Sequence, residues 1–252
     1  MATIYTDIQE FLRRERDLFG EFLLTGERAD EKRPPEPAPA MDTLFDLPAP
    51  APVPITTEAW GTAPTLAALD EAIHNCLRCP LGQTRTKFVF GVGNPRASLM
   101  LIGEAPGADE DLQGEPFVGR AGQLLTKILE AIHFTRDQVY ICNILKCRPP
   151  GNRKPQPSEV DQCLPYLRKQ IQLIQPKLIL CLGLTAAETL LETTESLGKL
   201  RGKVLRFEGT PLMVTYHPAA LLRNPHWKRP TWEDVQAVRT LHDQLVAGTS
   251  GA

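Results

Sequence analysis

The sequence predicts an α/β domain in which a mostly parallel sheet is covered by helices on both faces. From about Thr65 onward, short aliphatic runs alternate with longer segments whose apolar residues recur at helical spacing. The aliphatic runs are almost continuously apolar, which is typical of strands buried on both faces of a parallel sheet. In open sheets of this kind, ligands bind outside the carboxyl ends of the strands.

Four runs are expected to be strands and five segments to be helices. The expected strands are residues 98–103, 138–143, 177–183 and 211–216. The expected helices are residues 66–75, 119–131, 158–174, 185–191 and 232–247. The three most unusual segments follow expected strands, at residues 103–107, 143–150 and 217–225. We therefore expect the functional site at the carboxyl edge of the sheet.

The residues before this domain have a different composition. Residues 4–24 carry apolar side chains at helical spacing with charged residues between them, so residues 1–33 are expected to form an amphipathic helical segment. Residues 34–54 contain eight prolines, a composition that cannot bury a core. Residues 34–64 are therefore expected to be a Pro/Ala-rich disordered linker, and the folded domain is expected to span residues 65–252.

The charge of the chain is unevenly distributed. Residues 1–63 hold 12 acidic and 6 basic side chains, a net of −6, so the remaining 22 basic and 18 acidic residues leave residues 64–252 at +4. A mildly basic domain permits a nucleic-acid surface. No apolar run reaches the roughly 18 residues that a membrane span needs. Residues 1–28 also lack the apolar stretch of a secretory signal, so a cytoplasmic protein without a membrane partner is expected.

The six cysteines fall into two kinds. Cys142 and Cys181 lie inside apolar strand-like runs and are expected to be buried thiols. The other four lie beside basic residues and prolines, at Cys76, Cys79, Cys147 and Cys163. The first two form a CxxC pair, whereas the second two enclose 15 residues. Four thiolates bind either zinc or an iron–sulfur cluster; the wide second spacing favours the bulkier cluster, with zinc and then free thiols as alternatives.

Basic side chains surround the third cysteine of this set. Lys146, Arg148, Arg153 and Lys154 lie in or beside a loop that a bound metal would brace. Such a loop suits contacts with DNA phosphates. It is equally compatible with an ordinary solvated basic loop.

Five motifs in order resemble the family 4 uracil-DNA glycosylases of bacteria and archaea. The motifs are Gly-Glu-Ala-Pro-Gly-Ala-Asp-Glu at 103–110, Gly-Glu-Pro-Phe-Val-Gly at 114–119, Asn-Ile-Leu-Lys-Cys-Arg-Pro-Pro at 143–150, His-Pro-Ala-Ala-Leu-Leu-Arg-Asn-Pro at 217–225, and the four spaced cysteines. The resemblance covers roughly residues 65–245. It implies a three-layer sandwich around a central four-stranded, mostly parallel sheet, and a [4Fe-4S] cluster on Cys76, Cys79, Cys147 and Cys163.

The resemblance also implies an activity, namely hydrolysis of the bond between uracil and deoxyribose in base excision repair, leaving an abasic site without a lyase step. The target nucleotide must first leave the duplex. Leu221 matches the family's intercalating position and would fill the vacated stack, unless it packs inward, in which case Leu222 is the alternative. Arg223 is expected to hold a flanking phosphate, as are Lys146 and Arg148.

Within the expected pocket, Phe117 would stack on the flipped uracil, although a core position is the alternative. The Asn143 amide would donate to uracil O4 and accept from N3–H, and cytosine presents the reverse pattern at these two atoms. His217 would donate a hydrogen bond to uracil O2 as negative charge builds there. Ala105 and Gly107 belong to the substrate-binding loop, whose backbone N–H groups could add to this stabilisation.

Glu104 is the second catalytic candidate. The related family 1 enzymes carry a water-activating Asp at the position of Ala105 and a thymine-blocking Tyr at that of Gly107. Glu104 either positions the water, contacts the uracil edge, or braces the loop. Two alternative functions share the fold: a non-catalytic uracil- or nucleic-acid-binding module, and a glycosylase that also accepts hypoxanthine or mismatched thymine.

The expected partner is uracil-containing DNA, single- or double-stranded, bound by a monomer. Residues 41–47, Met-Asp-Thr-Leu-Phe-Asp-Leu, form an apolar island in the expected linker. They are either an apolar point in a tether or a docking peptide, and they loosely resemble the Leu-Phe peptides by which bacterial repair proteins hold the sliding clamp.

Overall fold

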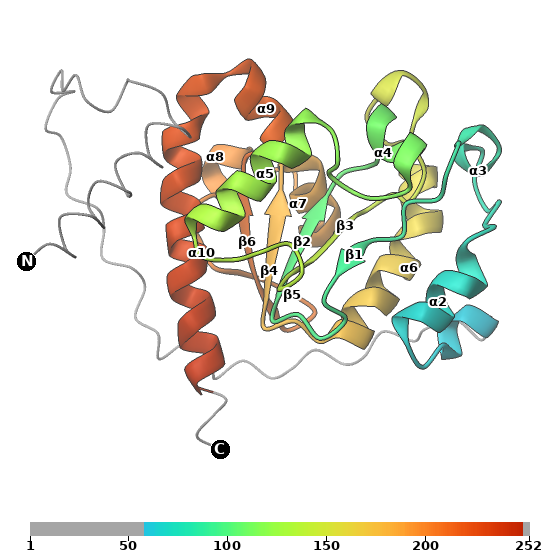
Figure 1. Ribbon diagram of the computed structural model, residues 1–252, viewed down its shortest axis with the longest axis horizontal. Coiled ribbons are helices and arrows are strands. Elements are labelled where there is room, and N and C mark those ends of the chain that lie inside the picture. Colours follow the sequence, from blue (N-terminus) through green and yellow to red (C-terminus); the bar gives the residue numbers. More distant parts are fainter. Residues whose placement is uncertain (1–57, 249–252) are drawn as a thin grey trace, which may run out of the picture. The chain divides into compact units, whose positions relative to one another are not determined.

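One sheet organises residues 58–248, the part of the chain that this computed structural model describes (Figure 1). Its strands are β1 (Val92–Gly93), β2 (Leu99–Gly103), β3 (Tyr140–Asn143), β4 (Leu178–Leu182), β5 (Leu205–Phe207) and β6 (Thr210–Thr215). They lie in the order β1-β3-β2-β4-β6-β5. The inner strands β3, β2, β4 and β6 are mutually parallel, whereas β1 and β5 are antiparallel edges. The expected four-stranded parallel sheet is thus confirmed as the centre of a six-stranded mixed one.

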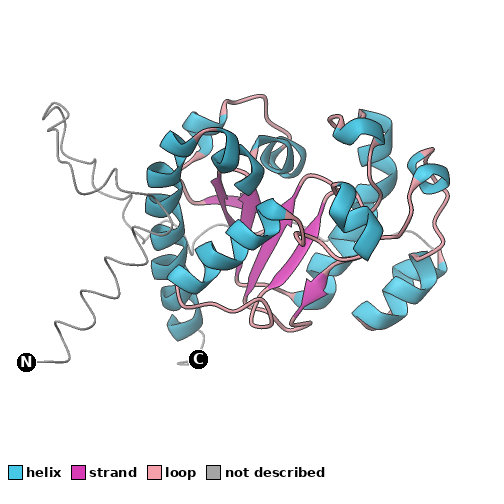
Figure 2. Ribbon diagram, turned by 45° about the horizontal axis from the view of Figure 1, so that its top comes forward, coloured by secondary structure: helices cyan, strands magenta, loops and turns pink. Residues whose placement is uncertain are grey.

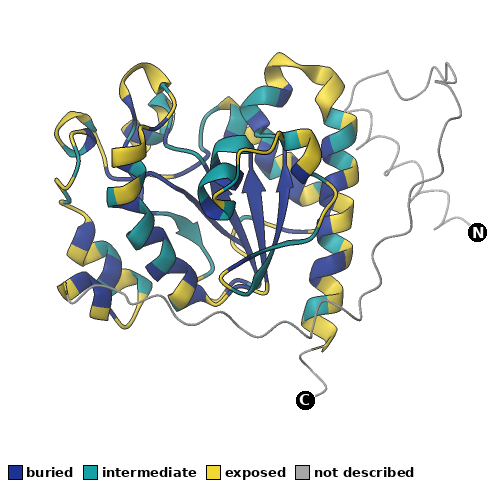
Figure 3. Cartoon of the chain, turned by 180° about the vertical axis from the view of Figure 1, so that it is seen from behind, coloured by how far each residue is buried: buried dark blue, intermediate teal, exposed yellow. Residues whose placement is uncertain are grey.

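The inner strands are apolar throughout because both of their faces are covered. Every residue of β2, β3 and β4 is buried, and these strands form the dark core of Figure 3. Successive residues of β2 point to opposite faces, so Leu99 and Leu101 join one apolar cluster while Met100 and Ile102 join another. Cys142 and Cys181 are fully buried in the sheet, as predicted.

Helices cover both faces of the sheet, as Figure 2 shows. One apolar cluster joins the sheet to α2 (Leu66–Ile73), α6 (Pro157–Ile174), α7 (Leu184–Leu191) and α8 (Leu197–Leu200). The other joins it to α5 (Arg120–Ala131), α9 (Pro218–Arg223) and α10 (Lys228–Gly248). The predicted three-layer arrangement and all five predicted helices are therefore confirmed. No helix among the described residues is long and apolar enough to cross a bilayer.

The elements that the sequence did not predict are short. They are η3 (Ala59–Thr62), α3 (Leu81–Thr84), α4 (Ala108–Gln113), η4 (Pro150–Asn152) and η5 (Pro225–Trp227), together with α8, α9, β1 and β5. None spans more than six residues, which is too short for a hydrophobic period to be read.

The folded domain begins before residue 65, so the predicted end of the linker is wrong. Trp60 in η3 is buried, and its ring meets the edge of Tyr166 in α6 with centroids 4.7 Å apart. Glu58 forms an ion pair with Arg78 across 3.4 Å. The predicted N-terminal helical segment, the linker up to residue 57 and the apolar island at 41–47 lie outside the described residues.

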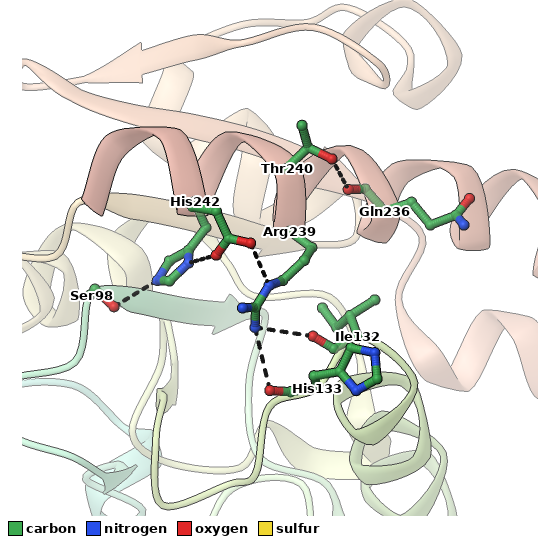
Figure 4. A network of polar contacts seen from close by, with 8 residues as sticks. Ser98, Ile132, His133, Gln236, Arg239, Thr240 and His242 are labelled. Carbon is green, nitrogen blue, oxygen red and sulfur yellow. Dashed lines mark hydrogen bonds and ion pairs between the residues drawn. The ribbon is translucent and has the colours of Figure 1, made fainter. Parts of the chain in front are cut away.

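Polar contacts fasten α10 along the sheet (Figure 4). His242 Nε2 lies 2.7 Å from Ser98 Oγ, at the start of β2. Arg239 donates to the carbonyls of Ile132 and His133, which follow α5. The C-terminal helix is therefore tied to the amino end of the sheet, which leaves the carboxyl end open.

Candidate active site

A pocket of about 350 Å³ opens at the carboxyl ends of the parallel strands. Asn143 is the last residue of β3, Gly183 follows β4, and His217 follows β6 by two residues. Seven of the predicted site residues line the pocket, namely Glu104, Ala105, Gly107, Phe117, Asn143, His217 and Arg223. The structure thus brings the three unusual segments together where the strand order led us to expect them.

Asn143 presents an unpaired acceptor at the bottom of the pocket. The residue is 2% exposed, and its side-chain Oδ1 is buried without a hydrogen-bond partner. A Cβ atom on Gly103 would overlap both Oδ1 and the Phe117 ring, so glycine is needed at the end of β2 to make room for them. An unsatisfied buried acceptor destabilises a protein by about 1–3 kcal/mol, and a ligand that donates a hydrogen bond to Oδ1 removes this penalty.

Phe117 forms one wall of the pocket in an unusual backbone conformation. Its φ is 55°, in the left-handed region that a bulky residue rarely adopts. Its ring lies against that of His217, with centroids 5.5 Å apart and planes 31° apart. The flat face of a planar ligand could therefore lie along Phe117 while its edge meets Asn143 and His217.

Two charged side chains hold the Phe117 loop from opposite sides. The Glu110 carboxylate accepts from the N–H groups of Val118 and Gly119, and also from Gly107 on the neighbouring loop. Arg136 donates to the carbonyls of Pro116 and Phe117 at 2.9 and 3.2 Å. The strained loop is thus clamped through its donors and its acceptors, and Glu110 joins it to the Gly107 loop.

His217 is held in one tautomer by the helix that follows it. It is the N-cap of α9, and its Nδ1 accepts from the Ala219 N–H at 3.1 Å. The proton of the neutral ring therefore resides on Nε2, which is free to donate. Burial in the pocket wall, and secondarily the charge of Arg223, lower the His217 pKa to about 4. The imidazole is consequently a neutral donor at physiological pH.

Glu104 lines the pocket beside these groups. Its backbone carbonyl accepts from the Leu145 N–H, which fixes the loop to the end of β3. Within residues 58–248, no hydrogen bond or ion pair engages its carboxylate. The carboxylate is therefore available to a water molecule or to a ligand.

The prediction that Leu221 is an exposed wedge is wrong. Residues 218–223 form α9, and the helix turns Leu221 into the apolar cluster beneath it, where it is 1% exposed. Leu222, the alternative, is 41% exposed. Arg223 is exposed at the pocket mouth. The apolar side chain that can reach DNA from this helix is therefore Leu222.

The prediction that Lys146 contacts phosphate is also wrong. The residue is fully buried, and its ammonium group donates to Asn143 O and Gln170 Oε1. Arg148 is half-buried and donates to Asn152 Oδ1, which leaves part of its guanidinium exposed. Farther along the loop, Arg153 and Lys154 form ion pairs with Glu159 and Glu188.

The four spaced cysteines form one group. Cys76 and Cys79 lie between α2 and α3, Cys147 follows β3, and Cys163 lies on α6. The Cys147 thiol interacts electrostatically with Cys76 and Cys79, and the Cys163 thiol with Cys147 and Cys79. Among residues 58–248, no three His, Cys, Asp or Glu side chains are placed to hold a single metal ion.

Hydrogen-bond donors surround these sulfurs. Arg85 Nη1 lies 3.3 Å from Cys147 Sγ, the Lys146 N–H lies 3.3 Å from Cys163 Sγ, and Tyr166 OH lies 3.2 Å from Cys76 Sγ. Burial raises the pKa of Cys163 to about 12, so that this thiol keeps its proton unless a metal displaces it. Donors aimed at sulfur and a nearby cation suit a negatively charged thiolate set.

Several pocket residues were missed by the sequence reasoning. Glu110, Leu182, Gly183 and Leu184 line the pocket. The signal for Gly183 was present, because it ends a predicted strand and has a φ of 97° that favours glycine. A Cβ atom there would lie 3.0 Å from His217 Cβ, so Gly183 makes room for the imidazole.

Comparison with known proteins identifies similar chains. The uracil DNA glycosylase superfamily model matches residues 90–238. A type-4 uracil-DNA glycosylase of Archaeoglobus fulgidus is 43% identical over 188 residues, which are 70% of this chain and 94% of the relative. The type-4 enzyme of Pyrobaculum aerophilum is 48% identical over 64% of this chain and 86% of its own. That of Thermotoga maritima is 40% identical over 68% and 92%, respectively.

Proposed function

This chain belongs to the uracil DNA glycosylase superfamily and, within it, to the type-4 uracil-DNA glycosylases, and from that premise we propose how its pocket removes uracil from DNA. The reaction is hydrolysis of the N-glycosidic bond in DNA repair. The roles assigned below to single residues rest on the geometry of the pocket. The observation that carries them is the buried, unpaired Oδ1 of Asn143.

Asn143 selects the base. Oδ1 accepts from uracil N3–H, and the amide NH₂ donates to O4. Cytosine presents an acceptor at N3 and a donor at N4, so it would leave Oδ1 unsatisfied and face one donor with another. Sites that hydrogen-bond a substrate group reject analogues lacking it by roughly 10⁴- to 10⁵-fold, which is the scale that a repair enzyme facing ordinary cytosine requires.

His217 stabilises the leaving uracil. Its Nε2–H is directed by the Ala219 N–H that occupies Nδ1. As the glycosidic bond lengthens, negative charge gathers on uracil O2, and this donor strengthens its hydrogen bond there. A neutral imidazole can donate without first losing or gaining a proton.

Glu104 positions the attacking water. It lies in the same loop as Ala105 and Gly107, which also line the pocket, while the Gly107 N–H is engaged by Glu110. The unengaged Glu104 carboxylate accepts a hydrogen bond from water on the sugar side of the pocket. Because water, and not an amine of the protein, attacks the sugar, the product is an abasic site and no lyase step follows.

The exposed rim receives the DNA. Phe117 stacks on the extruded base, and Leu222 takes the role first assigned to Leu221 by filling the space that the base leaves. Arg223 at the pocket mouth and the half-buried Arg148 contact flanking phosphates. The enzyme acts as a cytoplasmic monomer on single- or double-stranded DNA, and residues 41–47 are a candidate clamp-binding segment.

A [4Fe-4S] cluster fits the four-cysteine group. Cys76, Cys79, Cys147 and Cys163 would hold it. The Arg85 guanidinium would offset its negative charge, and the Lys146 backbone N–H and the Tyr166 hydroxyl would hydrogen-bond to its sulfurs. When bound, the cluster supplies a rigid cross-link between the α2–α3 connection, the segment after β3, and α6. Iron and zinc analysis of the purified protein separates a cluster from the zinc alternative.

One cleavage assay tests the function. Oligonucleotides carrying uracil, hypoxanthine or mismatched thymine are incubated with the enzyme and then treated with alkali, which breaks the strand at abasic sites. We expect breaks only at uracil, in single and double strands. Breaks at all three bases would indicate a broader glycosylase. Binding without breaks, by protein with its full iron content, would indicate a non-catalytic module.

A further inference from the structure

Lys146 is a buried cation whose partners lie directly behind the uracil pocket. The residue is fully buried, and Nζ donates to Asn143 O at 2.7 Å and to Gln170 Oε1 at 2.6 Å. Within residues 58–248, no carboxylate forms an ion pair with it. Burying an ammonium group without an opposite charge is costly, so stability alone does not explain a lysine here.

The far end of this contact is itself fixed. Gln170 lies on α6 and is fully buried. Its Nε2 donates to Phe90 O at 3.0 Å and to Tyr140 OH at 3.3 Å, so its Oε1 can point only toward Lys146. A continuous path of hydrogen bonds therefore runs from α6 through the ammonium group to the backbone of Asn143.

The segment between Asn143 and Cys147 is also tied through its backbone. The N–H groups of Ile144 and Leu145 donate to the carbonyls of Gly103 and Glu104 on the pocket loop. The Lys146 N–H donates to Cys163 Sγ on α6. The peptide group between Asn143 and Ile144 is therefore held at both ends, its N–H by the carbonyl of Gly103 and its oxygen by the Lys146 ammonium group.

We propose that Lys146 is a positioning residue that holds the Asn143 side chain in register with the uracil edge. The inference rests on the proposed function, because it assigns Asn143 to base recognition. Lys146 does not line the pocket and acts only through Asn143. Without the ammonium group, the Asn143 peptide keeps only the restraint at its N–H end, so its oxygen and the Asn143 side chain are held less firmly. The hydrogen bonds to the base weaken, whereas the contacts to DNA phosphates do not.

The test compares Lys146→Met with Lys169→Met. Lys169 is a second buried lysine, 7% exposed on α6, which donates to Gln172 and does not line the pocket. Two constants are measured for each protein: the inhibition constant of free uracil, and the dissociation constant for DNA carrying an uncleavable abasic-site analogue. Loss of one hydrogen bond to a charged group predicts a roughly tenfold weaker uracil inhibition in Lys146→Met. DNA affinity should change less than about twofold, and Lys169→Met should match the wild type in both constants.

The outcomes separate the inference from the function on which it rests. Uracil inhibition of Lys146→Met equal to that of the wild type would overturn the inference, as would an equal loss in Lys169→Met. If the wild type neither cleaves uracil DNA nor binds uracil, the proposed function fails instead. If Lys146→Met does not fold, Gln170→Met is measured in its place, because it removes the other acceptor of the same ammonium group. An unchanged uracil inhibition constant in Gln170→Met then overturns the proposal.

Discussion

At the scale of the single residue, one backbone N–H sets the chemistry of His217. The Ala219 N–H occupies Nδ1, and burial keeps the ring neutral, with a pKa of about 4. The same helix turn that orients the imidazole therefore also fixes which nitrogen carries the proton. A free histidine with a pKa near 6.5 would change its charge, and thus its hydrogen bonding, within the physiological range.

The excision rate should accordingly fall on the acid side only as the pH approaches 4, where His217 takes up a proton. Single-turnover excision rates measured from pH 4 to 8 should show no inflection near 6.5 that depends on His217. The stability of the protein depends on the same group. The unfolded chain binds a proton at His217 below about pH 6.5, whereas the folded chain does so only near 4, so the free energy of unfolding falls as the pH drops across this window.

His217→Ala should remove this pH dependence and lower kcat by roughly 100- to 1,000-fold with DNA affinity retained. An equal loss of affinity would make His217 a binding residue.

Asn143→Asp should shift base preference toward cytosine. A carboxylate keeps the acceptor but loses the NH₂ that meets uracil O4, and it can accept from the cytosine N4–H₂. We expect the ratio of kcat/KM for uracil over cytosine to fall at least roughly 100-fold, measured on matched oligonucleotides. Glu104→Gln serves as the control, because it changes a pocket carboxylate without touching the base selector. An unchanged ratio in Asn143→Asp would place the selector elsewhere.

At the scale of the element, the first turn of α5 presses directly on the strained Phe117 loop. A Cβ atom on Gly122 would overlap the backbone carbonyl and Cα of Phe117. Glycine in a helix costs about 1 kcal/mol relative to alanine, yet here it lets the helix approach the loop that carries the Phe117 ring. Close packing wins over helix propensity at this position.

Gly122→Ala should therefore destabilise the protein and disturb the pocket, against the preference of helices for alanine. Overpacking predicts a loss of about 1–3 kcal/mol in the free energy of unfolding, together with weaker inhibition by free uracil. Gly198→Ala in α8 is the matched control, because nothing lies within 4 Å of its added Cβ, and it should be neutral or stabilising. Urea unfolding and uracil inhibition measure both variants; wild-type behaviour of Gly122→Ala would refute the close-packing account.

The two leucines of α9 should have opposite phenotypes. Leu221→Ala empties a core position and should cost about 2–5 kcal/mol of stability. Leu222→Ala should leave stability unchanged but slow excision from double-stranded DNA by roughly tenfold, with little effect on single strands, where no stack needs filling. Thermal unfolding and excision rates on both substrates decide this. A strand-independent defect in Leu222→Ala would argue against the wedge.

Elements as short as α9 are the limit of what the sequence predicts. The four inner strands could be predicted because each is a buried apolar run, and the long helices because their apolar stripes repeat. For α9 the sequence favoured Leu221 as the exposed leucine and left Leu222 as the alternative. The helical phase that begins with His217 as N-cap and Pro218 at the first turn decides which one faces the core. For Lys146, the deciding partner is Gln170, 24 residues farther along, which no local pattern indicates.

At the scale of the whole molecule, the site is assembled at the carboxyl edge of the sheet from loops after four parallel strands. That location followed from the order of strands and helices, and the residues Asn143 and His217 followed from motifs at the strand ends. The clamp made by Glu110 and Arg136 did not, because it depends on loops packed against each other in space. Local sequence patterns thus identify candidate residues of the site, whereas tertiary contacts hold the loops of the site in place.

Truncation should reveal where the folded domain begins. A chain that starts at residue 58 should keep wild-type stability and excise uracil from short oligonucleotides. A chain that starts at residue 65 loses Trp60, whose burial against Tyr166 is worth about 3–5 kcal/mol, and it also loses the Glu58–Arg78 pair beside the cysteines. Its melting temperature and its iron content should both fall. Equal stability of the two truncated chains would show that residues 58–64 are dispensable.

The contact between Trp60 and Tyr166 has an optical consequence. The Tyr166 hydroxyl touches Cys76 Sγ, so the indole lies one aromatic ring away from a proposed cluster ligand. Iron–sulfur clusters absorb broadly at the wavelengths where tryptophan emits, so a cluster this close quenches the fluorescence of the indole by energy transfer. The fluorescence of Trp60 should therefore be quenched in the iron-loaded protein and restored in the iron-free protein. The partly exposed Trp227 next to α9 should emit in both forms. If the proposed cluster is bound, the fluorescence of Trp60 would report its loading without an added dye.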